Sequence, residues 1–130
     1  MKFIFILEIK IPIKIIIKLK GDAKAIHPGL EGIYLVSHFV NGYPVWENAV
    51  GEKESTYIWM NKNGTKWIVG TGKLIATKES DVVSMEHEEI VMYSLENGPL
   101  ETNHWAYYNG SEFIISTDIS VEPGNFVISI

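Results

Sequence analysis

The 130-residue sequence contains no cysteine. Disulfide bonds, thiolate nucleophiles and cysteine-ligated zinc sites are therefore excluded, and the fold must be stabilised by packing alone. A domain of this kind tolerates a reducing compartment. The cytoplasm is slightly favoured for that reason, and the localisation otherwise stays unknown.

Arginine is absent as well, so all eleven basic residues are lysine. Arginine is the residue best suited to bidentate recognition of phosphate and guanine, and the formal net charge is −5. Both facts argue against nucleic acid as a partner. The charge is also uneven, because residues 1–20 carry five Lys and one Glu, whereas 79–101 carries seven acids and no Lys. This asymmetry is typical of an interaction segment, although an AT-rich genome is a simpler source of the lysine bias.

Long hydrophobic runs are missing too. The apolar run Phe3–Leu7 is cut short by Glu8 and Lys10, which leaves it below the length of a signal-peptide core. No run approaches the roughly 18 apolar residues of a membrane span. From Leu7 to Lys20 apolar and mostly charged residues alternate, which is the period of a half-buried strand. Pro12 cannot donate a ladder hydrogen bond, so this strand should bend there or lie at an edge.

What the sequence does contain is a repeated aromatic hairpin. Trp59–Val69 and Trp105–Ile115 share the frame Trp-x3-Asn-Gly-x2-aromatic-Ile-aliphatic, and Val40–Tyr43 is a looser third copy. Asn-Gly favours a two-residue hairpin turn, because such a turn needs positive φ at its central positions. We therefore expect an all-β fold: a single antiparallel meander of about eight strands, closing into a small barrel or a two-layer sandwich.

The length predicts a single β domain covering residues 1–130, with 15–121 as the module core and 1–14 as a possible strand extension. Gly21–Gly32 reads as a loop that turns at His27-Pro28-Gly29. Asp81–Leu95 is ambiguous, because its ends suit strands while Met85–Glu89 could form one helical turn. The remaining expected strands are Ile33–Val40, Tyr43–Asn48, Tyr57–Lys62, Thr65–Val69, Leu74–Thr77, the two arms of the Trp105 hairpin, and Asn125–Ile130.

The hairpin register predicts which side chains face one another. Two-residue turns would set Trp59 opposite Ile68 and Met60 opposite Trp67, and likewise Trp105 opposite Ile114. One face of each ribbon must then be core, while the other is covered or exposed. An exposed aromatic face can stack sugar rings or peptide prolines, although packing in a two-layer core is the commoner use. The candidate ligand-binding residues are Tyr43, Trp46, Met60, Trp67, Tyr107 and Tyr108.

The order of turns and aromatic residues resembles a small β-rich module of multidomain eukaryotic proteins. The residues that carry the resemblance are Gly32-Ile33-Tyr34, Asn41-Gly42-Tyr43-Pro44-Val45-Trp46, Tyr57-Ile58-Trp59, Trp67-Ile68-Val69, Trp105-Ala106-Tyr107-Tyr108-Asn109-Gly110 and the strand at Asp118–Val121. The module's pattern is Gly-x-Tyr, Asn-Gly-x-Pro-Val-Tyr, Tyr-Leu-Tyr and Trp-x-Ile, followed by a Trp, a Gly and a final strand. The resemblance covers about residues 15–121 and implies a fold but no activity. Tyr43 stands where the module usually has Arg, and Trp46 where it has Tyr, so any ligand specificity carried by these positions is altered here.

No motif indicates an enzyme, a metal site or a cofactor. The four histidines are scattered without zinc-ligand spacing, and the acidic stretch around His87-Glu88-Glu89 lacks a calcium loop. A nucleophilic Ser in a Gly-x-Ser-x-Gly elbow is missing. Gly70-Thr71-Gly72-Lys73 is only a fragment of a phosphate-binding loop. A hydrolase that uses acids from Asp81–Glu101 is the last of the alternatives.

The sequence therefore predicts a non-catalytic binding or protein-interaction module. Self-association through the N-terminal strand is one way it could act, because Ile9–Leu19 alternates as an edge suited to β-augmentation. The competing interpretation is that this strand closes the domain's own sheet. The alternative function is a small-ligand or carbohydrate-binding β-barrel that uses an aromatic face. A short likeness of Glu47–Tyr57 to one loop and strand of streptavidin keeps that alternative open.

Overall fold

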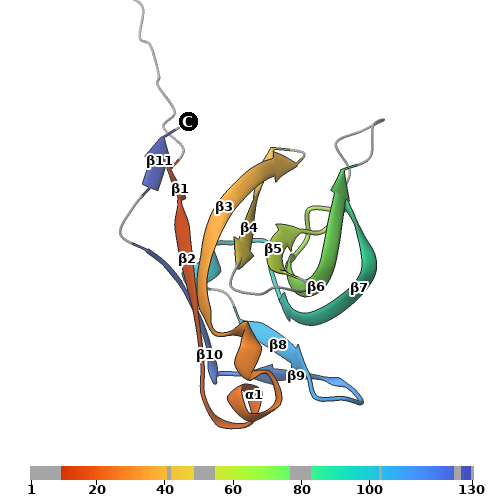
Figure 1. The fold of residues 1–130 in the computed structure, drawn as a ribbon. Coiled ribbons are helices and arrows are strands. Elements are labelled where there is room, and N and C mark those ends of the chain that lie inside the picture. The colour runs from red at the N-terminus through yellow and green to blue at the C-terminus, as the bar shows by residue number, and fades with distance from the viewer. Residues whose placement is uncertain are drawn as a thin grey trace, which may run out of the picture.

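The computed structural model describes residues 10–40, 42–48, 55–76, 83–102, 104–124 and 127–129. These residues form one antiparallel sheet of nine strands, curled until it nearly closes into a barrel, and a separate two-stranded sheet (Figure 1). The elements are β1 (Lys10–Pro12), β2 (Lys14–Leu19), α1 (Gly21–Ile26), the 3-10 helix η1 (Pro28–Leu30), β3 (Gly32–Val40), β4 (Tyr43–Asn48), β5 (Thr56–Met60), β6 (Trp67–Ala76), β7 (Val83–Ser94), the 3-10 helix η2 (Leu100–Thr102), β8 (Trp105–Tyr108), β9 (Phe113–Ser116), β10 (Ile119–Pro123) and β11 (Val127–Ser129). The predicted all-β barrel fold is confirmed.

The large sheet is a meander with one return. Strands β2 to β9 pair in chain order, and β10 then comes back to pair with the free side of β2. The small sheet joins β1 to β11. No helix in the part of the chain that the structure describes is long and apolar enough to cross a membrane.

The N-terminal strand divides at Ile13, next to Pro12, as the proline predicts. Its second half, β2, is hydrogen-bonded to β10 on one side and to β3 on the other. Its predicted alternation holds, because Ile15 and Ile17 are buried while Lys18 is exposed. β2 therefore belongs to the protein's own large sheet, with a partner strand on each side, and β1 pairs with β11 in the small sheet. Residues 1–9 lie outside the described residues.

The loop predicted for Gly21–Gly32 is wrong, because this segment contains α1 and η1. The helix has only six residues, which is too short to be stable alone or to show a helical period. Packing stabilises it instead, since Ala23 is 1% exposed and Leu30, at the end of η1, is 4% exposed. The Tyr34 hydroxyl donates a hydrogen bond of 2.7 Å to the Leu30 carbonyl oxygen, which fixes η1 against β3.

The helical alternative for Met85–Glu89 is also wrong, because these residues belong to β7. They pair with Lys73 and its neighbours in β6. Two register shifts interrupt the pairing of the long β6–β7 ribbon, between Val69 and Gly70 and between Thr71 and Lys73. Such shifts increase the local bend of a ribbon, and Figure 1 shows β6 and β7 curving together around the barrel.

The first repeated hairpin has the predicted register. Trp59 pairs with Ile68 and Met60 with Trp67. Its turn is longer than expected, because the Asn61 carbonyl oxygen accepts from Gly64 N–H at 3.0 Å and the Asn61 side chain accepts from Thr65 N–H at 2.8 Å.

The register predicted for the second hairpin is wrong by two residues. Trp105 pairs with Ser116 rather than Ile114, and Tyr108 pairs with Phe113. The reason is Asn109, whose side-chain oxygen accepts the N–H groups of Ser111 and Glu112, both at 2.9 Å. Asn109 therefore caps the turn from outside, and Gly110, at φ +105°, becomes its first central residue.

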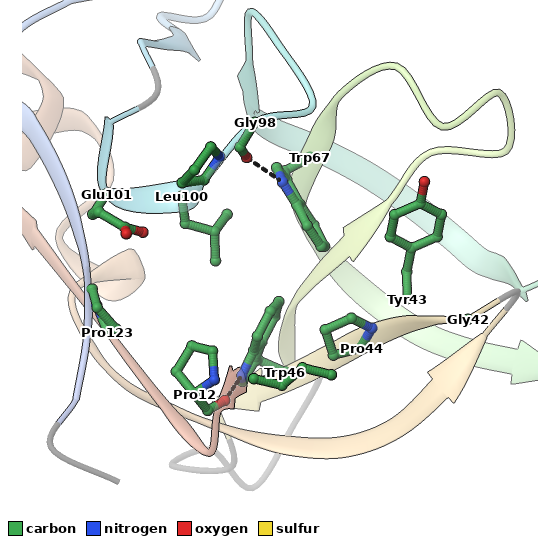
Figure 2. Close-up of a pocket in the computed structure, with 12 residues that line it drawn as sticks. Pro12, Gly42, Tyr43, Pro44, Trp46, Trp67, Gly98, Leu100, Glu101 and Pro123 are labelled. Atoms are coloured by element: carbon green, nitrogen blue, oxygen red, sulfur yellow. Dashed lines mark hydrogen bonds between the residues drawn. The ribbon is translucent and has the colours of Figure 1, made fainter. Parts of the chain in front are cut away.

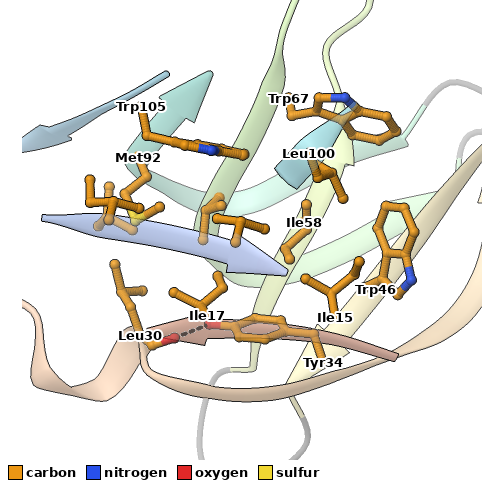
Figure 3. Close-up of a cluster of buried hydrophobic side chains, with 14 of the residues drawn as sticks. Ile15, Ile17, Leu30, Tyr34, Trp46, Ile58, Trp67, Met92, Leu100 and Trp105 are labelled. Carbon is orange, nitrogen blue, oxygen red and sulfur yellow. Dashed lines mark hydrogen bonds between the residues drawn. The ribbon is translucent and has the colours of Figure 1, made fainter. Parts of the chain in front are cut away.

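The core inside the barrel is built from aliphatic and aromatic side chains of opposite walls (Figure 3). Its largest fully buried members include Trp46, Trp105, Tyr34, Ile15, Ile17, Ile58 and Met92. A smaller cluster of Val45, Trp59 and Ile68 lies on the other face of the same strands. Both faces of β4, β5 and β6 are therefore packed, so most of the aromatic rings in these strands have no free face.

Candidate functional site

A groove of about 620 Å³ opens on one side of the barrel, and we call it the Trp–Pro groove. One wall is built from β1 and β4, and the other comes from the segment after β7 together with the end of β10 (Figure 2). Its lining residues are mostly apolar: Ile11, Pro12, Gly42, Tyr43, Pro44, Trp46, Trp67, Gly98, Pro99, Leu100, Glu101 and Pro123. This volume is within the range of small-molecule and peptide-side-chain sites, about 300–1,000 Å³.

Three aromatic rings line the groove, Tyr43 and Trp46 from β4 and Trp67 from β6. The ring centroids of Trp46 and Trp67 are 5.6 Å apart and the planes are tilted by 57°. Tyr43 meets Trp67 edge-on at 6.0 Å and 87°. Trp46 and Trp67 are 2% and 7% exposed, whereas Tyr43 is 38% exposed. The two indoles are thus fixed walls, and Tyr43 is the accessible ring at the rim.

The strand period explains how β4 contributes two liners. Pro44 and Trp46 are two residues apart and lie on the groove face, while Val45 between them packs into the smaller cluster on the opposite face. Pro44 can occupy this strand because β4 begins at Tyr43, directly after the β3–β4 turn.

Hydrogen bonds hold the opposite wall, Leu95–Glu101, against β6. The buried Ser94 hydroxyl accepts from Trp67 N–H at 2.7 Å and donates to the Glu96 carbonyl oxygen at 2.5 Å. The Asn97 side-chain amide donates to the Gly64 carbonyl oxygen at 2.9 Å, in the β5–β6 turn. This wall is therefore pre-formed rather than a loose loop.

The indole N–H groups are already used inside the protein. Trp67 Nε1–H donates to the Gly98 carbonyl oxygen at 3.1 Å, and Trp46 Nε1–H donates to the Pro12 carbonyl oxygen at 2.9 Å (Figure 2). The four prolines in the lining have no backbone N–H to offer. The groove consequently offers no donor from its indoles or prolines, while the Pro12 and Gly98 carbonyl oxygens and the apolar side chains form part of its surface.

Among the lining residues that the structure describes, Glu101 is the single charged side chain. It is exposed and lies in η2, and its carboxylate points toward the space beside Leu100 (Figure 2). No ion pair or hydrogen bond reaches this carboxylate from the residues whose positions the structure describes.

The structure brings together three of the six predicted site residues, namely Tyr43, Trp46 and Trp67. Met60 and Tyr107 belong to the buried core at 9% and 5% exposure, and neither lines the groove.

Tyr108 lies elsewhere, near the end of the β8–β9 hairpin. Its ring packs on Phe113 with centroids 5.2 Å apart, and its hydroxyl donates to the Gly110 carbonyl oxygen. Its own carbonyl oxygen is hydrogen-bonded by His27 Nε2. Tyr108 therefore takes part in joining this hairpin to α1 rather than in the groove.

Sequence reasoning missed the opposite wall and the prolines. Four of the five prolines in the chain line the groove, namely Pro12, Pro44, Pro99 and Pro123. The spacing of prolines and aromatics along the chain contains this signal only weakly, because the residues come from five separate segments.

A second, smaller cavity of about 430 Å³ lies on another part of the surface. Trp59, Tyr93 and Phe113 line it, together with two lysines. One of them, Lys66, places its Nζ 4.7 Å from the centre of the Tyr93 ring. None of the six predicted site residues lines this cavity. Within the described ranges, no three His, Asp or Glu side chains are grouped so that they could hold a metal ion.

No family model matches the chain, and neither a curated protein nor a solved structure shows significant similarity to it. The resemblance of residues 15–121 to a small β-rich module therefore stays a prediction, and the geometry of the groove has to support any functional proposal.

Proposed function

We propose that the protein is a non-catalytic binding module and that the Trp–Pro groove is its binding site. The observation that carries this proposal is a pre-formed groove of about 620 Å³, walled by three aromatic rings and four prolines. Pre-formed apolar concavities with a few polar groups are the usual form of ligand sites. Aromatic anchors next to rigid backbone also lose little conformational entropy when a partner binds.

The lining supports binding rather than a reaction. Nucleophilic catalysis needs a nucleophile beside a general base, and acid–base hydrolysis of glycosides needs two carboxyl groups. The twelve lining residues include no Ser, Thr, His or Lys, and Glu101 is their single carboxylate. A ligand held here would therefore meet surface and hydrogen-bond acceptors, without a pair of groups that could move a proton.

The polar groups of the groove favour an apolar protein segment over a carbohydrate. A sugar presents several hydroxyl groups, and each one that is buried has to be hydrogen-bonded. The groove supplies the Tyr43 hydroxyl, the Glu101 carboxylate and two carbonyl oxygens that already accept indole N–H groups. Stacking surface is present, but the hydrogen-bonding capacity is small for a sugar ring.

A neutral fluorophore tests whether the groove binds apolar groups. We expect N-phenyl-1-naphthylamine to increase its emission with the wild-type protein and to bind about fivefold more weakly to Tyr43→Ala, which removes one aromatic contact. Phe113→Ala is the matched control, because Phe113 is an aromatic residue with the same 38% exposure and lies outside the groove.

The two variants separate the possible outcomes. Weakening by Tyr43→Ala alone supports the groove as the site. Weakening by Phe113→Ala alone would assign the probe to the second cavity, which Phe113 lines, and would contradict the proposal. The absence of any emission change with the wild-type protein would contradict it as well.

A further inference from the structure

We propose that the Trp–Pro groove binds a basic–apolar segment of a partner protein, with a lysine side chain of the partner lying along the groove and its ammonium group at Glu101. This inference rests on the proposed function and specifies the chemistry of the ligand. Three features of the groove support it: the isolated charge, the excess of acceptors, and the size and shape of the apolar surface.

The negative charge of Glu101 at the groove favours a cationic ligand. Among the described residues, Glu101 is the one charged liner, and no cation of the protein itself pairs with it. The nearest acid on β10, Glu122, is already 3.6 Å from Lys18 Nζ. Glu101 is therefore the acidic group available at this rim. A charge-assisted hydrogen bond between an ammonium group and a carboxylate is stronger than a neutral one.

The hydrogen-bonding groups of the groove favour a ligand that donates hydrogen bonds. The Pro12 and Gly98 carbonyl oxygens each accept one indole N–H, and a carbonyl oxygen has two lone pairs. A peptide with free backbone N–H groups can donate to these oxygens. A proline-rich segment cannot, because it presents carbonyl oxygens and few N–H donors to a groove that is itself rich in acceptors. An anionic ligand would be repelled by Glu101.

The size of the groove fits a short segment better than a free amine. A single alkylammonium ion would fill a small part of about 620 Å³ and bury few methylene groups, each worth about 0.8 kcal/mol. This gain is small beside the cost of association, about 4–15 kcal/mol. A segment adds apolar neighbours that can pack against Tyr43 and Pro44 while the lysine stem lies on Leu100 and its charged end remains near water.

The experiment uses two peptides that differ only in the charge. The first is acetyl-Ser-Leu-Lys-Leu-Ser-amide, and the second has norleucine in place of the lysine. Binding is followed by the indole N–H resonances of Trp46 and Trp67 in ¹H–¹⁵N spectra, which report directly on both walls. The variants are Glu101→Gln and, as a control, Glu112→Gln, an exposed acid in the turn after β8.

We expect the lysine peptide to shift both indole resonances and to bind about fivefold more weakly to Glu101→Gln. Glu112→Gln should leave its affinity unchanged, and Glu101→Gln should not weaken the norleucine peptide. If both peptides bind equally well and Glu101→Gln has no effect, the lysine inference is overturned while the apolar groove is retained. If neither peptide shifts the two indoles, the inference is overturned and the proposed binding site loses its support as well.

Discussion

Ser94 joins β6, which carries Trp67, to the Leu95–Glu101 wall of the groove. Its side chain is 0% exposed and makes two hydrogen bonds, from Trp67 N–H and to the Glu96 carbonyl oxygen. Replacing Ser94 with alanine removes both bonds without a large change in volume. The substitution therefore tests the polar connection between β6 and the Leu95–Glu101 wall.

The expected loss of stability follows from where the two partners lie. Glu96 is exposed, so its carbonyl oxygen can be solvated and the lost bond costs about 1 kcal/mol. Trp67 is 7% exposed, so its N–H stays buried without a partner, at about 1–3 kcal/mol. The free energy of unfolding should fall by about 2–4 kcal/mol.

Urea unfolding followed by tryptophan fluorescence measures this loss. With a slope of about 2 kcal/mol per molar urea, the middle of the usual range, the midpoint should fall by about 1–2 M. Ser37→Ala is the control, because the Ser37 hydroxyl is exposed and its contact with the Val45 carbonyl oxygen is 3.3 Å long. A loss below 1 kcal/mol for Ser94→Ala, or one equal to that of the control, would refute the reasoning.

Three further substitutions test the core, the turns and the pH dependence. Ile17→Ala (1% exposed) should lower the free energy of unfolding by about 3 kcal/mol in urea unfolding, and Ile115→Ala (64% exposed) by less than about 0.5; equal losses would contradict the assigned core. Gly64→Ala should cost about 1 kcal/mol because φ is +67°, whereas Gly29→Ala, in open space, should cost nothing measurable in the same assay. Burial raises the pKa of Tyr34 to about 12. Its contribution to stability is therefore complete below pH 10 and should decline by about 2–3 kcal/mol as the pH rises toward 12, and Tyr34→Phe should remove that part of the decline.

The fold class could be predicted because its signals are local. Alternation in Leu7–Lys20 and the Asn-Gly turns each depend on residues that are close in the sequence. The hairpin of Trp59 and Ile68 has the expected register, because a four-residue loop centred on Asn63-Gly64 leaves the same strand positions opposite one another. A local pattern therefore suffices where the turn is symmetric about its expected centre.

The second hairpin and α1 show where local patterns fail. One side-chain oxygen, on Asn109, moves the turn centre by one residue and the strand register by two. The six residues of α1 are helical although their own period is too short to predict it, because Ala23 packs into the core cluster formed with distant strands. Neither the hydrogen bonds of the Asn109 side chain nor the burial of Ala23 can be predicted from the spacing of residues along the chain.

Only the aromatic residues of the candidate site could be predicted from the sequence. Tyr43, Trp46 and Trp67 could be chosen because aromatic residues near hairpin turns are conspicuous. Leu100 and Glu101 could not, because they meet the indoles only after β7 returns across β6. The sequence interpretation also assumed that one whole face of a hairpin could be exposed to solvent. In the structure both faces of β4 to β6 are covered, and the open surface lies at the ends of these strands.

β2 is completed by β10, a strand that the ribosome makes about one hundred residues later. Ile17 pairs with Val121, so the hairpins between them can form while one side of β2 still lacks its partner. An unpaired strand rich in isoleucine can pair with strands of other chains and so promote aggregation. Lys14 and Lys18, placed within this strand, can act as gatekeepers that keep the nascent chain soluble until Ile119–Pro123 arrives. In the folded protein Lys18 lies 3.6 Å from Glu122 of β10, the strand that completes β2.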